Sequence, residues 1–451
     1  MSSRLDLIIR GGSVVTPGGV QRVDLGVAEG RIVKMTTGLT ETATAVIEAA
    51  GLHVFPGILD AHVHFNEPGR AEWEGLATGS SALAAGGGTW FGDMPLNSLP
   101  PVLDAASFAA KKALALQKSV TDFSLWGGLV PGNLDQLGEL RNAGALGLKA
   151  FMCSSGVDEF TNVDASTLRA GMKRAAQLGM LVAVHAEDND LAAQHTAAAR
   201  ARGTDAATWL ASRPLELELA AIHLALELAG ETGCALHIVH VSSPEGIALI
   251  AAGKKRGVNV TAETCPHYLL LNENEVLRQG APAKCAPPLR PETSRRGLWR
   301  AAEQEGVDTI GSDHSPAPPG MKTAADFFAI WGGISGCQHG FPLLLSETLA
   351  RDAQALPRLA RQLAANVAQR FRLPHKGRLA VGFDADFSLL DLNQAHTLQN
   401  AALLYGHQQG PYAGRASTVK VVRTVRRGRT VYGEGRIASG AGDAQFLAPT
   451  S

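Results

Sequence analysis

The sequence is poor in cysteine, carries almost no net charge and contains no long apolar segment. Its five cysteines are scattered and odd in number, which is unlike a disulfide framework. A formal net charge of −1 removes the bulk electrostatic basis for binding nucleic acid or an anionic membrane. We find neither a signal-peptide core nor a run long enough to span a bilayer. These absences predict a soluble cytoplasmic protein with no nucleic-acid or membrane partner.

The chain does have the apolar content of a protein with a large interior. Apolar residues make up 45% and charged residues 18% of its 451 positions, and this length favours one large domain plus a smaller one. Short strand patterns with glycine and proline turns occupy residues 1–53, and the same texture returns after about residue 375. We therefore predict one small β domain made from residues 1–53 and 375–451, with residues 54–374 forming the second domain.

The middle of the chain alternates between short apolar strand patterns and Ala/Leu-rich helical stretches such as 105–116 and 217–229. The expected strands are residues 58–64, 89–94, 122–126, 147–151, 181–185, 235–241, 258–263 and 308–313. Eight such strand–helix units predict an α/β fold, a (β/α)₈ barrel. An open doubly wound sheet has a similar alternation, but no G-x-G-x-x-G follows the first strand.

Histidines, a lysine and an aspartate stand at the C-terminal ends of five of these expected strands. In Asp60-Ala61-His62-Val63-His64 the two histidines are separated by one residue, so on a strand their side chains share one face. The other strand-end residues are Lys149, His185, His240 and Asp313. Each alone has an ordinary explanation as a hydrogen-bonded strand end, a turn or a helix cap. Together they match a two-metal hydrolytic site with nitrogen and oxygen ligands.

Two further histidines are given other roles. His237 lies three residues before His240, so on one regular strand the two side chains face opposite sides. Because His240 is nearer the C-terminal end of the strand, we assign it to the metal and His237 to packing or to support of a ligand. His314 directly follows Asp313, and we expect it to face the substrate or to support the site.

Lys149 cannot itself bind a cation, because an ammonium group has three donors and no acceptor. Its neighbours Leu148, Ala150 and Phe151 would desolvate it and favour the neutral amine. A neutral amine can capture carbon dioxide to form a carbamate, whose two oxygens could bridge two divalent ions. The alternative, a lysine that pairs with Asp or Glu inside the barrel, stays open on the residues alone.

Five motifs, in this order, resemble those of the cyclic amidohydrolases, the family of allantoinase, dihydropyrimidinase (hydantoinase) and dihydroorotase. They are Asp60-Ala61-His62-Val63-His64, Gly147-Leu148-Lys149-Ala150-Phe151, Val184-His185-Ala186-Glu187, His237-Ile238-Val239-His240-Val241-Ser242-Ser243 and Ser312-Asp313-His314-Ser315-Pro316. The resemblance covers nearly the whole chain and implies a metal-dependent barrel with a small β-sandwich domain. It implies that His62 and His64 hold one metal, and that His185 and His240 hold the other. It also implies that a carboxylated Lys149 bridges the two metals, and that Asp313 binds the first metal and acts as general base.

Single positions distinguish the branches of this family. Dihydroorotase-like proteins carry Arg two positions after the second histidine, where this chain has Asn66. Dihydropyrimidinase-like proteins carry Tyr five residues after the bridging lysine, where this chain has Ser154. The remaining segments resemble bacterial allantoinases, above all Met94-Pro95-Leu96-Asn97 and Trp331-Gly332-Gly333-Ile334.

The resemblance thus implies hydrolysis of the hydantoin ring of allantoin to allantoate. A hydroxide bridging the metals would attack the ring carbonyl, and Asp313 would carry the proton to the departing nitrogen. The candidate substrate contacts are Asn97, Ser154, Cys285, His314 and Gly333. Arg70 and Arg290 are expected to form scaffold ion pairs rather than substrate clamps, because allantoin is uncharged near neutral pH.

The expected cofactors are two divalent ions per subunit and a CO₂-derived carbamate on Lys149. Imidazole and carboxylate ligands suit Zn²⁺, but also Co²⁺, Mn²⁺, Ni²⁺ or Fe²⁺. The family resemblance also implies a homotetramer. The alternatives in function are a hydantoinase-type enzyme, then a dihydroorotase, and last a non-catalytic scaffold relative. A scaffold relative should lack metal ligands, whereas all six positions are filled here.

Overall fold

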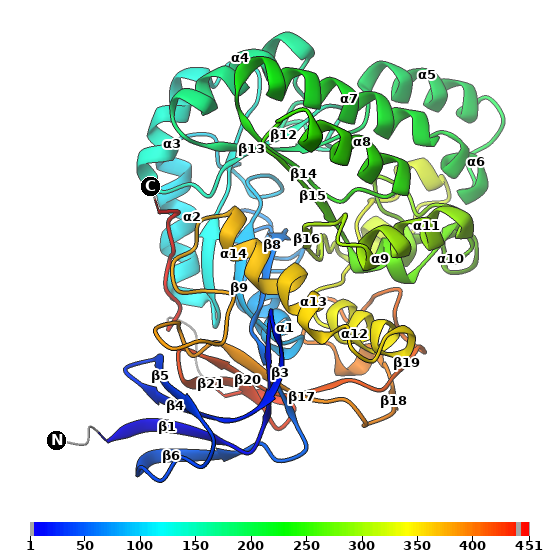
Figure 1. Ribbon diagram of the computed structural model, residues 1–451. Helices are drawn as coiled ribbons and strands as arrows, with labels where there is room; N and C mark the ends of the chain where they lie inside the picture. Colours follow the sequence, from blue (N-terminus) through cyan, green and yellow to red (C-terminus); the bar gives the residue numbers. More distant parts are fainter. Residues whose placement is uncertain (1–3, 439–442, 451) are drawn as a thin grey trace.

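The computed structural model describes residues 4–438 and 443–450. Its centre is a set of parallel strands that follow one another in chain order (Figure 1). They are β8 (Ile58–Val63), β9 (Gly88–Asp93), β10 (Asp122–Leu125), β11 (Gly127–Gly128), β12 (Leu148–Phe151), β13 (Leu181–His185), β14 (Ala235–Ile238), β15 (Val260–Thr264) and β16 (Thr309–Ile310). The strand order is β10-β9-β8 in one sheet and β11-β12-β13-β14-β15-β16 in the other.

The two parallel sheets meet at both of their edges. β10 and β11 are consecutive in the chain, and the Trp126 N–H between them donates to Asp93 O at 3.0 Å. At the other edge, the His64 N–H donates to His314 O at 2.8 Å, and Val63 and His314 form a parallel bridge. The strand ends that carry the candidate site residues are thereby brought to one end of the strand set.

Helices cover the outside of the parallel strands (Figure 1). They are α1 (Leu76–Ala85), α2 (Ala105–Lys118), α3 (Leu137–Ala143), α4 (Ala165–Gln177), α5 (Asn189–Arg200), α6 (Ala206–Ala211), α7 (Leu215–Thr232), α8 (Pro244–Lys255), α9 (Pro266–Leu270), α10 (Glu273–Gln279), α11 (Glu292–Glu303), α12 (Gly340–Arg351), α13 (Leu356–Ala360) and α14 (Asn366–Arg370). Several begin at a side chain that accepts a hydrogen bond from the first turn, as Asp104 does for α2 and Ser243 for α8. In the part of the chain that the structure describes, no helix combines the length and apolar character needed to cross a membrane.

Strands from both ends of the chain form a separate β region below the parallel strands (Figure 1). From the N-terminal part come β1 (Leu5–Arg10), β2 (Ser13–Thr16), β3 (Gly19–Arg22), β4 (Asp24–Ala28), β5 (Arg31–Thr36), β6 (Ala43–Glu48) and β7 (His53–Pro56). From the C-terminal part come β17 (Phe387–Asp391), β18 (His396–Thr397), β19 (Ala416–Ser417), β20 (Lys420–Arg426), β21 (Arg429–Gly433) and β22 (Arg436–Ile437). One sheet runs β5-β4-β1-β6, and a second, β22-β21-β20-β17-β7-β2-β3, joins strands from both ends of the chain.

The last described residues leave the β region and lie along β10. The Phe123 N–H donates to Gln445 O at 3.0 Å, and the Leu447 N–H donates to Phe123 O at 2.8 Å. The Phe446 ring packs against Phe123 and Phe108. This segment therefore contacts the central strands, although the predicted boundary at residue 375 groups it with the small β domain.

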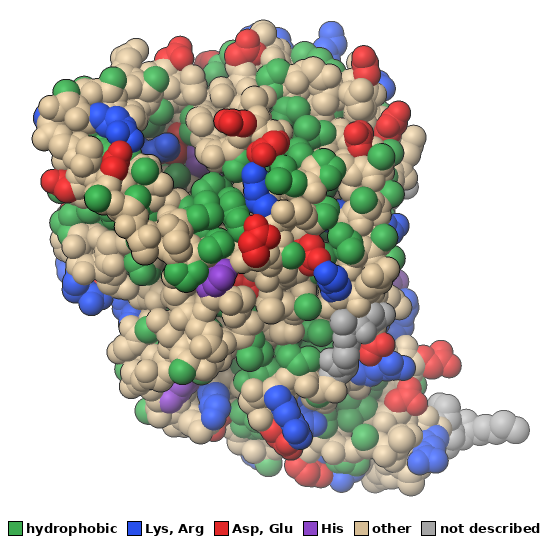
Figure 2. Space-filling view, turned by 180° about the vertical axis from the view of Figure 1, so that it is seen from behind, with side chains coloured by type: hydrophobic (Ala, Val, Ile, Leu, Met, Phe, Trp, Pro, Cys, Tyr) green, Lys and Arg blue, Asp and Glu red, His purple; other side chains and the backbone are tan. Residues whose placement is uncertain are grey.

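Figure 2 shows the face opposite to that of Figure 1, on which acidic and basic side chains are interspersed. This face carries no broad field of one sign, which agrees with the near-zero net charge of the sequence.

Candidate metal centre

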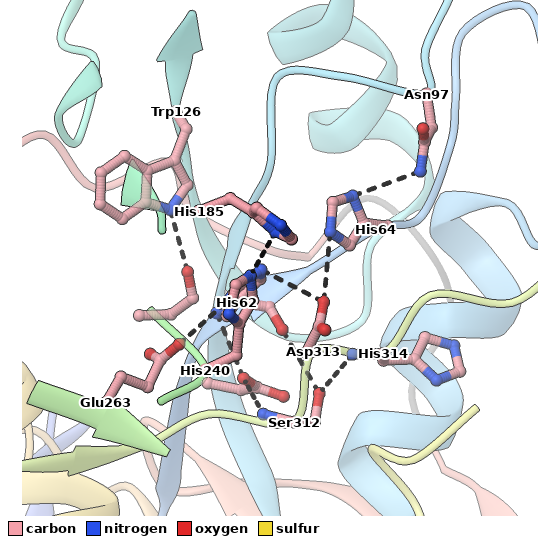
Figure 3. A network of polar contacts seen from close by, with 12 residues as sticks. His62, His64, Asn97, Trp126, His185, His240, Glu263, Ser312, Asp313 and His314 are labelled. Atoms are coloured by element: carbon pink, nitrogen blue, oxygen red, sulfur yellow. Dashed lines mark hydrogen bonds and ion pairs between the residues drawn. The ribbon is translucent and has the colours of Figure 1, made fainter. Parts of the chain in front are cut away.

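The strand ends bring the predicted ligand residues together in one buried cluster. Five of the six are labelled in Figure 3. The six residues come from five places in the strand set, namely His62 on β8 and His64 directly after it, Lys149 on β12, His185 on β13, His240 after β14 and Asp313 after β16. All six are at most 8% exposed. The sequence placed these side chains at the ends of expected strands, and in the structure they lie on those strands or within three residues of their ends.

The first half of the cluster is formed by Asp313, His62 and His64. Asp313 Oδ1 lies 3.2 Å from His62 Nε2 and 3.4 Å from His64 Nε2. Burial alone would raise the pKa of Asp313, but the imidazoles of His62, His64 and His240 hold it well below its usual range. Asp313 is therefore a carboxylate that faces two ring nitrogens.

The second half is formed by His185 and His240, whose rings meet edge to face. His185 Nδ1 lies 3.0 Å from His240 Nε2, and burial lowers the pKa of both side chains. Neutral imidazole is the form that binds metal ions. One ligand atom each from His62, His240 and Asp313 lie within 4.8 Å of one another, so the two halves adjoin.

Lys149 is fully buried, and its Nζ has no hydrogen-bond partner among the described residues. Burial lowers its pKa to about 8, although Asp313 and Glu263 oppose the shift. A buried ammonium group without a partner lowers the stability of the folded protein. Of the two roles left open by the sequence, pairing with a carboxylate therefore has no hydrogen-bonded partner to support it.

Four residues around the cluster adopt a left-handed backbone conformation. They are Asn66 (φ 65°), Asn97 (φ 67°), His240 (φ 41°) and Asp313 (φ 44°). This region is unfavourable for residues with a side chain, and such strain gathers at functional sites. The regular strands end before two of these residues, since β14 stops at Ile238 and β16 stops at Ile310. The face-alternation argument used for His237 and His240 therefore does not apply, although its assignment of His240 to the cluster agrees with the structure.

Carboxylates behind the cluster hold two of the ring systems. Glu263 Oε1 lies 2.8 Å from His62 Nδ1, and Glu187 Oε2 lies 2.9 Å from His185 Nε2. Burial opposes ionisation, but these imidazoles and their neighbours lower the pKa of both carboxylates to about 2. Sequence reasoning gave neither glutamate a role. The one available clue was a carboxylate at the end of an expected strand, or two residues beyond a strand-end histidine.

Glu187 also belongs to a second group with Cys153 and His185. Arg213 pairs with Glu187 there and already supplies the positive charge. This group is therefore better explained as an ion pair that supports His185 than as a further metal site.

His237 and His314, the two histidines given other roles from the sequence, lie outside the cluster. His237 Nδ1 lies 2.7 Å from Thr261 Oγ1 and its Nε2 lies 3.4 Å from Glu263 Oε2, as expected for a supporting residue. The His314 ring points away from Asp313 (Figure 3): its Nδ1 accepts from the Gly336 N–H, and its Nε2 lies 3.4 Å from Glu74 Oε2. Of its two expected roles, the structure places His314 in the supporting one, because its ring is fully buried between protein groups.

A cavity of about 70 Å³ opens onto the cluster. It is lined by His62, His64, Leu96, Asn97, Phe151, Ser154, Ser155, His185, His240, Cys285, Ala286, Asp313, Ser315, Trp331, Gly332 and Gly333. Four of the five candidate substrate contacts are among them, and His314 is not. The Gly333 N–H is already donated to Lys284 O at 2.9 Å, so it is not free to donate to a ligand.

A second, outer pocket of about 580 Å³ shares five lining residues with this cavity. The shared residues are Ser154, Ser155, Ala286, Trp331 and Gly332. Arg70 lies in the outer pocket and pairs with Glu159 at 3.0 Å, while Arg290 lies 3.4 Å from Glu218. Both arginines are therefore in ion pairs within the protein, as expected.

The donor set fits bound cations. Glu263 accepts from His62 Nδ1, so the Nε2 lone pair of His62 points at Asp313 Oδ1, which is also an acceptor. Two acceptors 3.2 Å apart are repulsive unless the ring is protonated or a cation lies between them. Lys149 Nζ and His240 Nδ1 are also buried and have no hydrogen-bond partner among the described residues. The centre therefore contains buried nitrogen atoms whose bonding capacity the protein alone does not satisfy.

Comparison with known proteins agrees with this arrangement. The model of the amidohydrolase family matches residues 53–431. Among solved structures, the L-hydantoinase (dihydropyrimidinase) from Arthrobacter aurescens superimposes with a TM-score of 0.96 at 31% identity, covering 98% of this chain and all of that one. A dihydropyrimidinase from Brevibacillus agri gives a TM-score of 0.92 at 30% identity, covering 98% of each chain.

Curated relatives are more similar in sequence. The allantoinase of Deinococcus radiodurans is 50% identical over 99% of both chains. That of Rubrobacter xylanophilus is 49% identical over 99% of this chain and 98% of its own. The chain therefore belongs to the amidohydrolase family, and this membership implies a divalent metal centre. Within that family its sequence groups with the allantoinases.

Proposed function

We propose that this protein is an allantoinase, which opens the hydantoin ring of allantoin by hydrolysis to give allantoate. The observation that carries the proposal is the buried cluster of four histidines, Lys149 and Asp313 beside a small cavity. The chain that contains it is 50% identical to an allantoinase over 99% of both sequences.

We propose that His62, His64 and Asp313 hold one divalent ion and that His185 and His240 hold the other. Lys149 would join the two as a carbamate, because its buried, unpaired amine has a pKa lowered to about 8. Zn²⁺ is the first candidate among the ions that suit such ligands, and elemental analysis of the purified protein identifies it. When bound, the ions supply a water that is acidic enough to ionise near neutral pH, and they polarise the carbonyl of the ring amide.

Asp313 acts as general base in this proposal. Its Oδ1 faces the imidazoles of His62 and His64, which leaves Oδ2 to accept the proton from the attacking water. The carboxylate is in the required form because its pKa is held low. The same oxygen then gives the proton to the ring nitrogen as the C–N bond breaks.

The cavity walls orient the ring and exclude water. Asn97 and Ser154 line the cavity with polar groups, and Cys285 lines it with a thiol whose pKa burial raises to about 12. A neutral thiol of this kind contributes shape and a weak donor, not a nucleophile. The exocyclic ureido group of allantoin would extend past Ser155 and Trp331 into the outer pocket.

A neutral substrate agrees with the charges around the cavity. Asn66 stands where a carboxylate-binding arginine would be expected, and its amide donates to Pro316 O at 3.4 Å. Arg70, which lines the outer pocket, is paired with Glu159. Nothing in this arrangement requires an anionic substrate, which disfavours dihydroorotate.

The deciding experiment measures kcat/KM for allantoin, hydantoin, dihydrouracil and dihydroorotate, with the protein reconstituted separately with Zn²⁺, Mn²⁺ and Co²⁺. We expect allantoin to be preferred, and the Asp313→Asn variant to be inactive on every substrate. A clear preference for hydantoin or dihydrouracil would replace the proposal with a hydantoinase-type activity. Inactivity of the wild-type protein on all four, with both metals bound, would favour the scaffold alternative.

We also infer a closed (β/α)₈ barrel, supported by the hydrogen bonds at both sheet edges, with a β-sandwich domain built from the two chain ends. The homotetramer and the cytoplasmic location stay predictions. Light scattering of the purified protein tests the first, and cell fractionation tests the second.

A further inference from the structure

One loop forms the wall between the inner cavity and the outer pocket. We call residues 327–333 the rim loop. Its residues Trp331 and Gly332 line both spaces, Gly333 lines the inner cavity, and Ile330 lines the outer pocket. Apart from one short 3₁₀ turn, Phe327–Ala329, the rim loop has no regular secondary structure. Its carbonyl groups must therefore find partners elsewhere.

The first partner is the ammonium group of Lys284, a side chain that is only 3% exposed. Lys284 Nζ donates to Phe327 O at 2.6 Å, to Ile330 O at 2.5 Å and to Phe328 O at 3.4 Å. The same residue holds the far end of the loop, because its backbone O accepts from the Gly333 N–H at 2.9 Å. The rings of Trp209 and Phe327 flank the ammonium at 4.9 and 5.2 Å.

The second partner is Lys322, which binds the other half of the loop. Its Nζ donates to Gly333 O at 2.7 Å and to Trp331 O at 2.9 Å, and a third contact reaches Ala281 O at 3.4 Å. The two lysines together satisfy the carbonyls of five of the seven rim-loop residues.

Neither ammonium has a carboxylate among its hydrogen-bond partners in the described chain. Burial lowers the pKa of Lys284 and of Lys322 to about 7, and the charge of Lys322 adds to the shift of Lys284. A buried ammonium group without a carboxylate partner lowers the stability of the folded protein. Several carbonyl oxygens that converge on one point are typical of a cation-binding site. Here the cations are the ammonium groups of Lys284 and Lys322.

The rim loop has little freedom to move inward. A Cβ on Gly333 would lie 2.2 Å from Ser315 O, so the backbone of the loop is packed directly against the segment that follows Asp313. A change in the anchoring of the loop would therefore change the shape of the inner cavity beside the proposed catalytic carboxylate.

We propose that Lys284 and Lys322 are positioning residues, whose ammonium groups pin the rim loop and thereby set how tightly the substrate is held. The proposal rests on the proposed function for the identity of the substrate, but the pinning itself does not. Removal of either ammonium releases the loop, which weakens ground-state binding more than it slows the chemical step, because neither lysine touches the ligand cluster.

The test compares Lys284→Ala with the wild-type protein by hydrogen exchange and by kinetics. We expect amide exchange in peptides covering residues 327–333 to accelerate at least tenfold, and KM for allantoin to rise at least tenfold with kcat within about threefold. Added ethylammonium chloride should bind to the carbonyl groups that Lys284 contacts in the wild type, and should restore both the exchange rate and KM in a saturable way. Tetramethylammonium cannot donate hydrogen bonds and should restore neither. Bound metal should be unchanged.

The matched control is Lys254→Ala, which removes a partly buried lysine paired with Asp308 and should leave rim-loop exchange and KM unchanged. Exchange and KM of Lys284→Ala within twofold of wild type would overturn the proposal, as would acceleration that ethylammonium does not reverse. If Lys284→Ala does not fold, Lys322→Met at the less buried site is measured in the same way. If the wild-type protein does not open allantoin, the proposed function fails, while the exchange data still decide whether the lysines pin the loop.

Discussion

Glu263 Oε1 lies 2.8 Å from His62 Nδ1, and both side chains are 1% exposed. A carboxylate only accepts hydrogen bonds, so this contact places the ring proton on Nδ1 and turns the Nε2 lone pair toward Asp313. His237 Nε2 lies 3.4 Å from the second oxygen of Glu263. Glu263 therefore fixes both the tautomer and the direction of a proposed metal ligand without touching the cavity.

The first prediction concerns this contact. Glu263→Gln can present its NH₂ group to His62 and so permit the wrong tautomer, and we expect metal affinity to fall about 10- to 100-fold. Metal content after dialysis against graded chelator measures the effect. The control is Glu227→Gln, because Glu227 makes a similar contact with His223 at 3.1 Å on the exposed face of α7. Equal metal retention in the two variants would contradict the role of Glu263.

The second prediction concerns Lys149. Its Nζ is fully buried and unpaired, so Lys149→Ala should remove the proposed carbamate bridge and reduce both metal content and activity roughly to background. Short carboxylic acids such as acetate should partly restore activity to the variant and leave the wild-type rate unchanged. A stoichiometric content of two metals in Lys149→Ala would tell against the bridge.

The residues of the buried cluster could be placed together from the sequence because each belongs to a local strand pattern. Parallel strands align their C-terminal ends at one edge, so His62, Lys149 and His185 could be placed together from strand position alone. β13 was expected at residues 181–185 and was found as Leu181–His185. The expected strand at 308–313 is shorter in the structure, Thr309–Ile310, and the backbone at Asp313 is left-handed.

The supporting residues were not predictable, because their partners lie far away along the chain. Glu263 meets His62 across 201 positions, and Lys322 acts only because the rim loop folds over it. The same holds for β7, which pairs with β17 from the other end of the chain. Burial, which shifts the pKa of Lys284 and Lys322, exists only after folding.

The third prediction concerns the mouth of the outer pocket. Arg70 pairs with Glu159, donates to Asn97 O at 3.3 Å and lies over the Trp73 ring, so it ties together loops that surround the pocket. Glu159→Arg should repel Arg70 and lower kcat/KM for allantoin about tenfold, equivalent to about 1.4 kcal/mol. Hydantoin has no ureido group to reach this region, so its kcat/KM should change little.

The exchanged pair Arg70→Glu with Glu159→Arg should recover most of the loss for allantoin, because the ion pair is rebuilt with its ends reversed. The control is the same exchange at Arg169 and Glu231, an exposed pair at 3.0 Å between α4 and α7. A parallel loss for allantoin and hydantoin in Glu159→Arg would mean that the pair acts on the whole fold and not on the exocyclic group.

The fourth prediction concerns Lys376, which joins the parallel strands to the β region. Its Nζ lies 2.8 Å from Asp122 Oδ2 on β10 and 2.6 Å from Asp386 Oδ2 beside β17, and all three side chains are buried. Removing one partner of a buried ionic group leaves the others uncompensated, so Lys376→Met should lower the free energy of unfolding by about 3–5 kcal/mol. Lys420→Met, at an exposed position of β20, is the control and should change it little.

The pH dependence of that loss identifies its electrostatic origin. Burial opposes ionisation of Asp122, but Lys376 and Arg427 lower its pKa below the unfolded value of about 3.9. A depressed carboxyl pKa stabilises the folded state above the unfolded pKa, and this stabilisation is lost as the pH falls through the folded pKa. The difference between wild type and Lys376→Met should therefore be widest near pH 7 and should narrow as the pH falls below about 4 toward the lowered folded pKa of Asp122. Denaturant unfolding at pH 7, 5 and 3.5 measures it, and a difference independent of pH would assign the loss to packing instead.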